Sequence, residues 1–240
     1  MRTMTARSVL LSVLLGTHPG AASAAELVRL TADFGVKETA LRVALTRMVA
    51  TGDLERSADG YRLSERLQAR QRRQDESMRP TVRPWEGGWH LVIVTSIGAG
   101  AAERAELRNS LRAERFGELR EGVWMRPDNL EPQFDASISS RIRVLQGRDD
   151  DPVELASRLW DLPAWAAGCE QLLNEIDCAP EVPDRFLVAA AIVRHLLADP
   201  VLPAELLPAD WPGARLRAAY QHFVAELASR RDSVQLTEAG

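Results

Sequence analysis

The spacing of apolar residues in the first third of the chain predicts three helices followed by a β-hairpin. The predicted helices cover residues 5–16, 24–34 and 36–51. Ser23 supplies an N-cap for the second helix, and Gly35 ends it. Two short strands follow, joined by an Asp59-Gly60 turn, at residues 54–56 and 61–63. This order of elements is that of a winged helix-turn-helix.

The predicted third helix has one apolar face and one polar, cationic face. A helix fits the major groove of DNA, and residues one turn apart on it reach neighbouring base edges. Thr39, Arg42 and Thr46 have that spacing. The hairpin can rest on the DNA backbone with arginines against phosphates. We therefore predict a DNA-binding surface that consists of Lys37, Thr39, Arg42, Thr46, Arg47, Arg56 and Arg62.

Other interpretations of this first segment stay open. The three helices can form a small domain whose arginines are only solvated, or one that binds another protein. A fourth predicted helix, residues 65–78, carries Arg66, Arg70, Arg72 and Arg73. Those arginines can extend a phosphate-binding surface, or the helix can be a charged linker, and the sequence favours neither.

The second segment follows a proline-containing linker at residues 79–84. Its predicted elements are a strand at 89–95, a helix at 102–115, strands at 118–120 and 123–126, a short helix at 129–136 and a strand at 141–145. This is the order of a ferredoxin-like domain. Helical periodicity dominates the remainder, with helices predicted at 152–161, 164–176, 184–197 and 211–230.

Together these elements predict an α+β protein with three domains. A winged helix-turn-helix with its following helix covers residues 1–78, a ferredoxin-like middle domain covers 85–148, and a helical C-terminal domain covers 149–240. A length of 240 residues, 45% of them hydrophobic, permits a substantial core and excludes a disordered or collagen-like chain. The two cysteines are too few for a disulfide scaffold or a four-cysteine zinc site.

Charge is distributed unevenly along the chain. The formal net charge is −4, yet residues 1–84 hold 14 Arg and Lys against 9 Asp and Glu, whereas the rest holds 16 against 25. A basic first third suits a polyanion such as DNA. The acidic remainder is then available for other contacts.

The apolar run at residues 9–15 has two possible meanings. Arg2 and Arg7 precede it, and Ala22-Ser23-Ala24 resembles a signal-peptidase cleavage site. This arrangement of a basic, an apolar and a small-residue segment also fits a secretory signal peptide. We favour a core helix, because the run is short and interrupted at helical spacing. Cleavage would also remove the first helix of the winged unit. No run approaches the roughly 18 apolar residues needed to span a bilayer, so we expect a cytoplasmic protein that does not bind membranes.

Three short motifs resemble chemical sites only weakly. Gly98-Ala99-Gly100 is placed like a dinucleotide fingerprint, but Glu103 stands at the third glycine position and would repel a pyrophosphate. The Asp149-Asp150-Asp151-Pro152 run fits a capped helix start better than a cation site. His195 and Asp199 have metal-ligand spacing without a third ligand. We therefore expect no catalytic residue, no metal and no cofactor.

The C-terminal part carries the most specific resemblance. Residues 199–213, DPVLPAELLPADWPG, preceded by Phe186-Leu187 and His195, closely resemble the PaaX family of bacterial transcriptional regulators. The resemblance covers nearly the whole chain. The helix with Arg42 and Arg47 is similar to the family's recognition helix, and shorter matches are WEGGW at residues 85–89, GVWMRP at 122–127 and LWDL at 159–162.

The resemblance implies a dimeric DNA-binding repressor with a winged helix, a ferredoxin-like middle domain similar to small CRISPR-associated nucleases, and a helical C-terminal domain. In the best-known members an aryl-CoA thioester such as phenylacetyl-CoA relieves repression. Two departures stand out. The wing tip, Ser57-Ala58-Asp59-Gly60, is shorter and less basic than is usual in the family. Thr95-Ser96 replaces the aspartate that the nucleases carry after their first strand, so we expect no nuclease activity.

We therefore predict a transcriptional regulator that is not an enzyme. It binds double-stranded operator DNA as a homodimer, represses a catabolic operon, and is released by a small effector such as an aryl- or acyl-CoA. The sequence does not assign the effector-binding residues. One alternative is an enzyme that acts on acyl-CoA or a nucleotide through the middle domain. Another is a protein-docking module without a DNA role.

Overall fold

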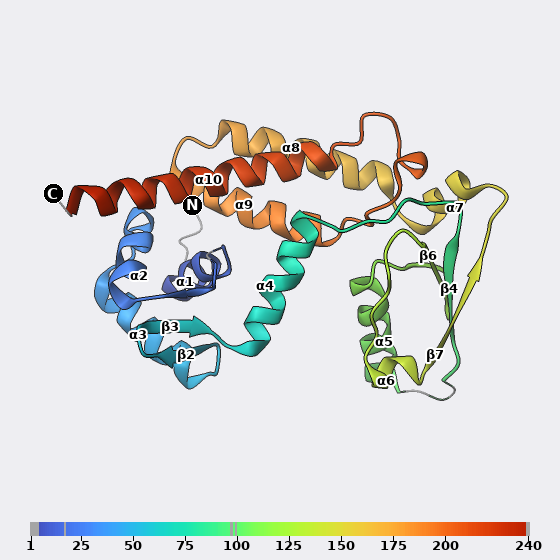
Figure 1. Ribbon diagram of the computed structural model, residues 1–240, viewed down its shortest axis with the longest axis horizontal. Helices are drawn as coiled ribbons and strands as arrows, with labels where there is room; N and C mark the ends of the chain where they lie inside the picture. Colours follow the sequence, from blue (N-terminus) through green and yellow to red (C-terminus); the bar gives the residue numbers. More distant parts are fainter. Residues whose placement is uncertain (1–4, 17, 97, 99, 239–240) are drawn as a thin grey trace. The chain divides into compact units, whose positions relative to one another are not determined.

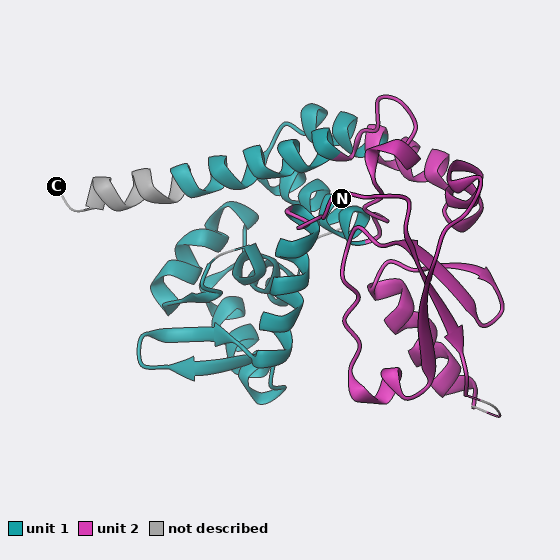
Figure 2. Ribbon diagram, turned by 45° about the vertical axis from the view of Figure 1, so that its right-hand side comes forward, with its two compact units in different colours: residues 1–78, 171–197, 214–240 teal, residues 79–170, 198–213 magenta. Residues whose placement is uncertain are grey.

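The computed structural model describes residues 5–16, 18–96, 98 and 100–238. The chain divides into two compact units, shown in separate colours in Figure 2. Unit 1 comprises residues 1–78, 171–197 and 214–240, and unit 2 comprises residues 79–170 and 198–213. The last predicted segment, residues 149–240, therefore contributes to both units. The three domain boundaries stay a prediction.

Unit 1 begins with the predicted winged helix-turn-helix (Figure 1). Its helices are α1 (Ala6–Gly16), α2 (Ala24–Thr31) with the short 3-10 turn η1 (Ala32–Phe34), and α3 (Glu38–Ala50). The hairpin consists of β2 (Leu54–Ser57) and β3 (Gly60–Leu63). The N-cap prediction is confirmed: the Ser23 hydroxyl accepts from the Glu26 amide at 3.2 Å, and the Glu26 carboxylate accepts from the Ser23 amide at 2.7 Å.

The helices of the winged unit enclose a core of leucines. Leu10 and Leu14 of α1 pack with Leu27 of α2, Leu41 of α3 and Leu63 of the hairpin, and all are fully or almost fully buried. Burial of such side chains stabilises a fold by about 1.5–3 kcal/mol each. The apolar run in α1 therefore forms a core helix, as its spacing predicts.

A third strand, β1 (Ala21–Ala22), was not predicted from the sequence. It pairs antiparallel with β3, so the sheet order is β1-β3-β2. Two residues are too few to show a strand pattern. The same pairing explains Gly60, because a Cβ atom there would lie 2.5 Å from the carbonyl oxygen of Ala22. The two turn residues of the hairpin are Ala58 and Asp59, since Gly60 already pairs with Ser57.

A buried carboxylate ties the winged unit together at the turn between α3 and β2. Asp53 Oδ2 accepts from Arg7 of α1 at 2.7 Å, and Oδ1 accepts from Arg66 at 2.6 Å. Arg66 belongs to α4 (Glu65–Met78), the helix that follows the hairpin. The Asp53 amide donates to the Met48 carbonyl of α3. One residue thus joins three helices, two through its side chain and one through its backbone amide.

The C-terminal helices α9 (Val182–Leu197) and α10 (Gly213–Glu238) pack on the winged part of unit 1. Phe186 of α9 makes an edge contact with Phe34 of η1, with ring centroids 4.7 Å apart. Tyr220 of α10 accepts from Gln74 of α4 at 3.1 Å. Helix α4 also packs against α9, so it is an integral part of unit 1 and not a free linker.

Unit 2 is built around the predicted ferredoxin-like domain. Its elements are β4 (Trp89–Val94), α5 (Ala101–Ala113), β5 (Gly117–Arg120), β6 (Val123–Pro127), α6 (Ala136–Ser139) and β7 (Ile142–Gly147). The sheet order is β5-β6-β4-β7 with all neighbours antiparallel, which is ferredoxin-like topology. The fold-class prediction is confirmed.

The predicted helix at residues 129–136 is wrong. Helix α6 has only four residues and starts after Asp135, whose carboxylate accepts from the Ile138 amide at 2.9 Å. Pro132 explains the difference, because a proline inside a helix removes a backbone hydrogen bond and clashes with the preceding turn. An irregular loop, residues 128–135, takes the place of the second ferredoxin helix.

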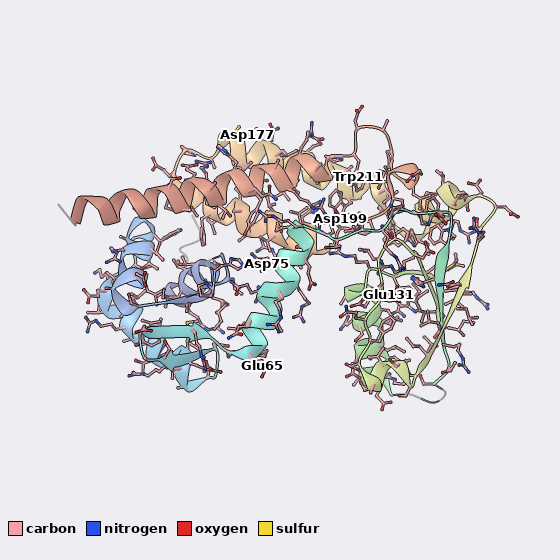
Figure 3. The ribbon with its side chains drawn as sticks, in the orientation of Figure 1. Glu65, Asp75, Glu131, Asp177, Asp199 and Trp211 are labelled. Carbon is pink, nitrogen blue, oxygen red and sulfur yellow. The ribbon has the colours of Figure 1, made fainter. Side chains whose placement is uncertain are left out.

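The other face of the sheet is covered by the segments that follow it in sequence. Trp89 of β4 is fully buried there among side chains of α7 (Pro152–Leu159), the first turn of α8 (Leu162–Cys178) and η2 (Ala204–Leu206). Trp211 (labelled in Figure 3) stacks on Trp165 with ring centroids 4.6 Å apart. Within the described ranges, no helix is both long and apolar enough to cross a membrane.

The charge on Asp53 should matter for the stability of the winged unit. We expect Asp53→Asn to lower the free energy of unfolding at pH 7 by about 1–3 kcal/mol, because two charge-assisted hydrogen bonds to largely exposed arginines weaken. The hydrogen bond and charge of Arg7 hold the Asp53 pKa below its ordinary value of 3.8. This stabilisation is present above pH 3.8 and is lost as the pH falls through the folded-state pKa.

Urea denaturation of the variant and the wild type between pH 7 and pH 3 measures this loss. The difference between the two proteins should shrink toward acid pH. Asp33→Asn is the matched control, because Asp33 is exposed on η1. Equal stability of wild type and Asp53→Asn at pH 7 would contradict the role given to this carboxylate.

Candidate nucleic-acid interface

The start of α3 lies two residues later than the sequence predicts. Lys37 is the N-cap residue, with extended backbone angles, and Glu38 is in the first turn. Val36 and Lys37 therefore precede the helix. The Lys37 side chain is exposed beside the first turn of α3.

The outer face of α3 is open to solvent in unit 1. The predicted contact residues Thr39, Arg42, Thr46 and Arg47 are all exposed on it. Leu41, Ala44, Leu45 and Met48 are buried and form the apolar face of the helix, whereas Ala40 is exposed. Val43 is also exposed, by 51%, and is the apolar member of this polar face.

Arg42 is held in place by a carboxylate of its own helix. Its Nε and Nη2 atoms donate to Oε1 of Glu38 at 3.0 and 2.5 Å. The side chain stays 75% exposed. This pair uses the side edge of the guanidinium, while the end edge formed by Nη1 and Nη2 is the one that binds guanine O6 and N7. Glu38 therefore orients Arg42 without blocking base contact.

The two hairpin arginines lie on opposite faces of the hairpin. Arg62 pairs across the strands with Glu55, with Nε to Oε2 at 2.9 Å, and Arg56 lies over the Tyr61 ring at 5.9 Å. Because side chains alternate along a strand, the Arg56–Tyr61 pair is on the core-facing side with Leu54, and Arg62 is on the other. The structure does not bring these two arginines to one surface.

A hollow of about 480 Å³ lies beside α3 and was not predicted. The start of α1 forms one wall and the outer face of α3 the other, and the lining residues are Thr5, Ala6, Arg7, Thr39, Ala40, Val43, Ala44 and Arg47. The sequence signal that could have found it is Val43, a large apolar residue within a polar helix face.

Carboxylates of unit 1 neutralise several of its arginines. Arg7 and Arg66 bind Asp53, Arg42 binds Glu38, and Arg62 binds Glu55. In contrast, the described residues hold no ion-pair partner for Lys37, Arg47 or Arg56. The cations that are available for phosphates are therefore fewer than the number of basic residues in this region indicates.

Three models of one protein family match most of the chain. Residues 5–67 match the family model described as PaaX-like protein, residues 82–146 match the PaaX protein central Cas2-like domain, and residues 160–234 match the PaaX-like protein C-terminal domain. The chain belongs to the PaaX family. The members of this family are transcriptional regulators, so the family supports a regulatory role.

A solved structure of similar fold is that of an uncharacterised protein, Rv0674, from Mycobacterium tuberculosis. It is 63% identical, with a TM-score of 0.87, and the match covers 96% of this chain and 99% of that one. No curated protein matches the chain. This likeness supports the fold described above.

The weak motifs of this PaaX-family chain have structural roles. The Glu103 carboxylate accepts from the Gly100 amide at 2.9 Å, so an anion already occupies the N-terminus of α5. Asp151 accepts from the Glu154 amide at 3.1 Å and caps α7. Among the residues that the structure describes, no three His, Cys, Asp or Glu side chains form a metal-binding group. Arg2 and Ala99 lie outside the described residues.

Because Arg42 is paired with Glu38, substitutions at these two residues should affect base discrimination and overall DNA affinity differently. We expect Arg42→Ala to weaken binding to a preferred DNA site by about 1–3 kcal/mol and to relax base preference at one position. Glu38→Gln should instead raise affinity for unrelated DNA, because it removes a negative charge, and should reduce discrimination, because Arg42 is less well oriented. Site selection from random DNA followed by binding titrations measures both quantities.

Arg194→Ala is the control for these two variants, since Arg194 is an exposed arginine of α9 in the same unit. We expect it to change neither affinity nor base preference. Unchanged discrimination in Arg42→Ala would remove Arg42 from the set of base-reading residues.

Proposed function

We propose that this chain is a DNA-binding transcriptional repressor of a catabolic operon. The observation that carries the proposal is the outer face of α3, which is exposed, cationic and supported by a folded winged unit. Arg42 on that face presents the end edge of its guanidinium, and Lys37 and Arg47 lie beside it without acidic partners in the described part of the chain. Double-stranded DNA is the partner that this combination fits best.

Within this face the residues divide into two roles. Thr39, Arg42 and Thr46 are placed to read base edges, and the methyl groups of Val43 fit a thymine methyl group. Lys37 and Arg47 are placed to bind phosphates on either side. Only one of the two hairpin arginines, Arg56 or Arg62, can face the same DNA backbone, since they lie on opposite faces.

We further propose that the protein acts in the cytoplasm as a homodimer and has no catalytic role. A small effector, such as an aryl-CoA thioester, relieves repression. An effector shifts the equilibrium only if it prefers the arrangement that does not bind DNA. The packing of α9 and α10 on the winged unit supports such control, because any displacement of these helices acts on the DNA-binding unit directly.

The test is binding of the full chain to a selected DNA site at increasing salt. Affinity should fall steeply, and Lys37→Ala and Arg47→Ala should each reduce the slope of log K against log salt by about 1, because each phosphate contact releases counterions. The Arg194→Ala control should keep the wild-type slope. Binding that does not depend on salt, or no binding at all, would overturn the DNA-binding proposal.

The same titration, repeated with phenylacetyl-CoA, related acyl-CoA thioesters and the free acids, tests the effector class. Release of DNA by one thioester and not by its free acid supports the proposal. If no thioester alters DNA affinity, the effector assignment is wrong, while the DNA-binding assignment stands on the salt measurement.

A further inference from the structure

Two buried polar side chains of the ferredoxin-like domain carry nitrogen atoms that have no hydrogen-bond partner among the described residues. His90 of β4 and Arg126 of β6 are directly opposite each other across the two strands. They are only 4% and 3% exposed. Both lie on the α5 side of the sheet, because His90 shares its face with Val92, which packs against Leu107 and Leu111 of α5. Within the part of the chain that the structure describes, neither ring nitrogen of His90 has a partner, nor has Nη2 of Arg126.

Arg126 is anchored without a close ion pair in the described part of the chain, although the more distant carboxylates of Glu114 and Glu131 favour its charge. Its Nη1 donates to the Glu114 carbonyl at 2.8 Å, its Nε donates to the Pro127 carbonyl at 3.2 Å, and the guanidinium lies 5.6 Å from the Phe116 ring centroid. No carboxylate of the described residues forms an ion pair with it. Burial lowers the pKa of Arg126 to about 10, so it is still a cation at pH 7. A buried cation is costly unless an anion accompanies it.

His90 completes the polar surface beside this cation. Burial, and next the charge of Arg126, lower its pKa, while Glu131 and Asp128 raise it and Arg83 lowers it. The neutral ring at pH 7 offers one N–H donor and one acceptor. Neither is used within the described residues. Two strands therefore bring at least two unused donors to one place.

The loop 128–135, where the second ferredoxin helix is missing, lies near this pair, because its Phe134 packs on Phe116, the ring that the Arg126 guanidinium contacts. Glu131 of this loop is labelled in Figure 3. Asn129 of the loop donates to the carbonyl of Val201 at 2.9 Å. Val201 has a left-handed φ of 52°, an uncommon conformation for a β-branched residue, which is held by this bond and by the Asp199 carboxylate. An irregular loop can open beside the pair more easily than a helix could.

We propose that His90 and Arg126 form a binding site for an oxyanion, either a carboxylate or a phosphate group, of a small organic molecule. The unused Nη2 of Arg126 and the His90 N–H donate to its oxygens, and the two carbonyl bonds of Arg126 hold the guanidinium in position. Phe134 of the nearby loop packs on Phe116, with centroids 5.9 Å apart, and supplies an apolar wall. That this molecule is the effector rests on the proposed function, whereas its binding does not.

The signal of His90 in nuclear magnetic resonance spectra of the full chain tests binding without DNA. The chain has four histidines, so the ring C–H signals can be assigned with a His90→Gln variant. Inorganic phosphate and benzoate are the two probes, and sodium chloride at equal ionic strength is the control. We expect one probe to shift the His90 signal saturably and to raise the midpoint of its titration by about 1 pH or more, because a neighbouring anion favours the imidazolium.

Arg126→Gln should abolish this shift, and Arg143→Gln, a change of an exposed arginine on β7 of the same sheet, should leave it unchanged. Arg126→Gln can also unfold the domain, so a second measurement is needed. The probe that binds should raise the thermal midpoint of the wild type above the chloride control, and His90→Gln should lose that increase.

Each outcome decides the proposal. A shift with phosphate alone identifies a phosphate-bearing ligand, and a shift with benzoate alone identifies an aromatic carboxylate. No response to either probe beyond that to chloride, in both measurements, would overturn the oxyanion site. Failure of the DNA-binding proposal would not alter these signals, so the two failures are distinguishable.

Discussion

The buried carboxylate of Asp53 is the interaction on which the winged unit depends. It lies at the turn after α3 and binds one arginine from α1 and one from α4. The same contacts place the start of α1 beside the outer face of α3 and form the hollow there. They also remove Arg7 and Arg66 from the cations that can meet DNA. The ion pairs of Asp53 with Arg7 and Arg66 thus contribute both to the stability of the winged unit and to the shape of the candidate interface.

The second constraint is the chain path, which passes between the two compact units four times. Helices α9 and α10 pack on each other through Phe186, Phe223 and the ion pair of Arg185 with Glu226 at 2.6 Å, and Phe186 also contacts Phe34 of the winged part. The segment between these helices, residues 198–213, belongs instead to the ferredoxin-like unit. A ligand held in that unit would therefore act on a segment that continues directly into both helices.

Much of this organisation follows from sequence patterns. The capping residues and apolar spacing predict α2, α4 and the buried side of α3, and the order of strands predicts the ferredoxin-like sheet. Local patterns could not show β1, which has two residues, or the need for glycine at position 60, which arises from contact with Ala22. The helix at 129–136 was predicted in spite of Pro132 and does not form.

The candidate sites were less predictable than the fold. Exposure of Arg42 follows from helical spacing, but its bond to Glu38 depends on side-chain geometry. The cross-strand partners of Arg56 and Arg62 depend on the exact turn: the structure pairs Arg56 with Tyr61, whereas a turn at Asp59-Gly60 would pair it with Leu63. His90 and Arg126 are polar residues in strands, for which exposure is the ordinary expectation. Only the structure shows them to be buried together.

The proposed DNA binding requires the outer face of α3 to enter the major groove. Methylation of guanine N7 by dimethyl sulfate tests this most directly, because N7 lies in the major groove and adenine N3 lies in the minor groove. On a DNA site selected by the full chain, we expect bound protein to protect at least one guanine N7 in the selected sequence. Unprotected guanines throughout that site, together with protection of adenine N3, would contradict the claim.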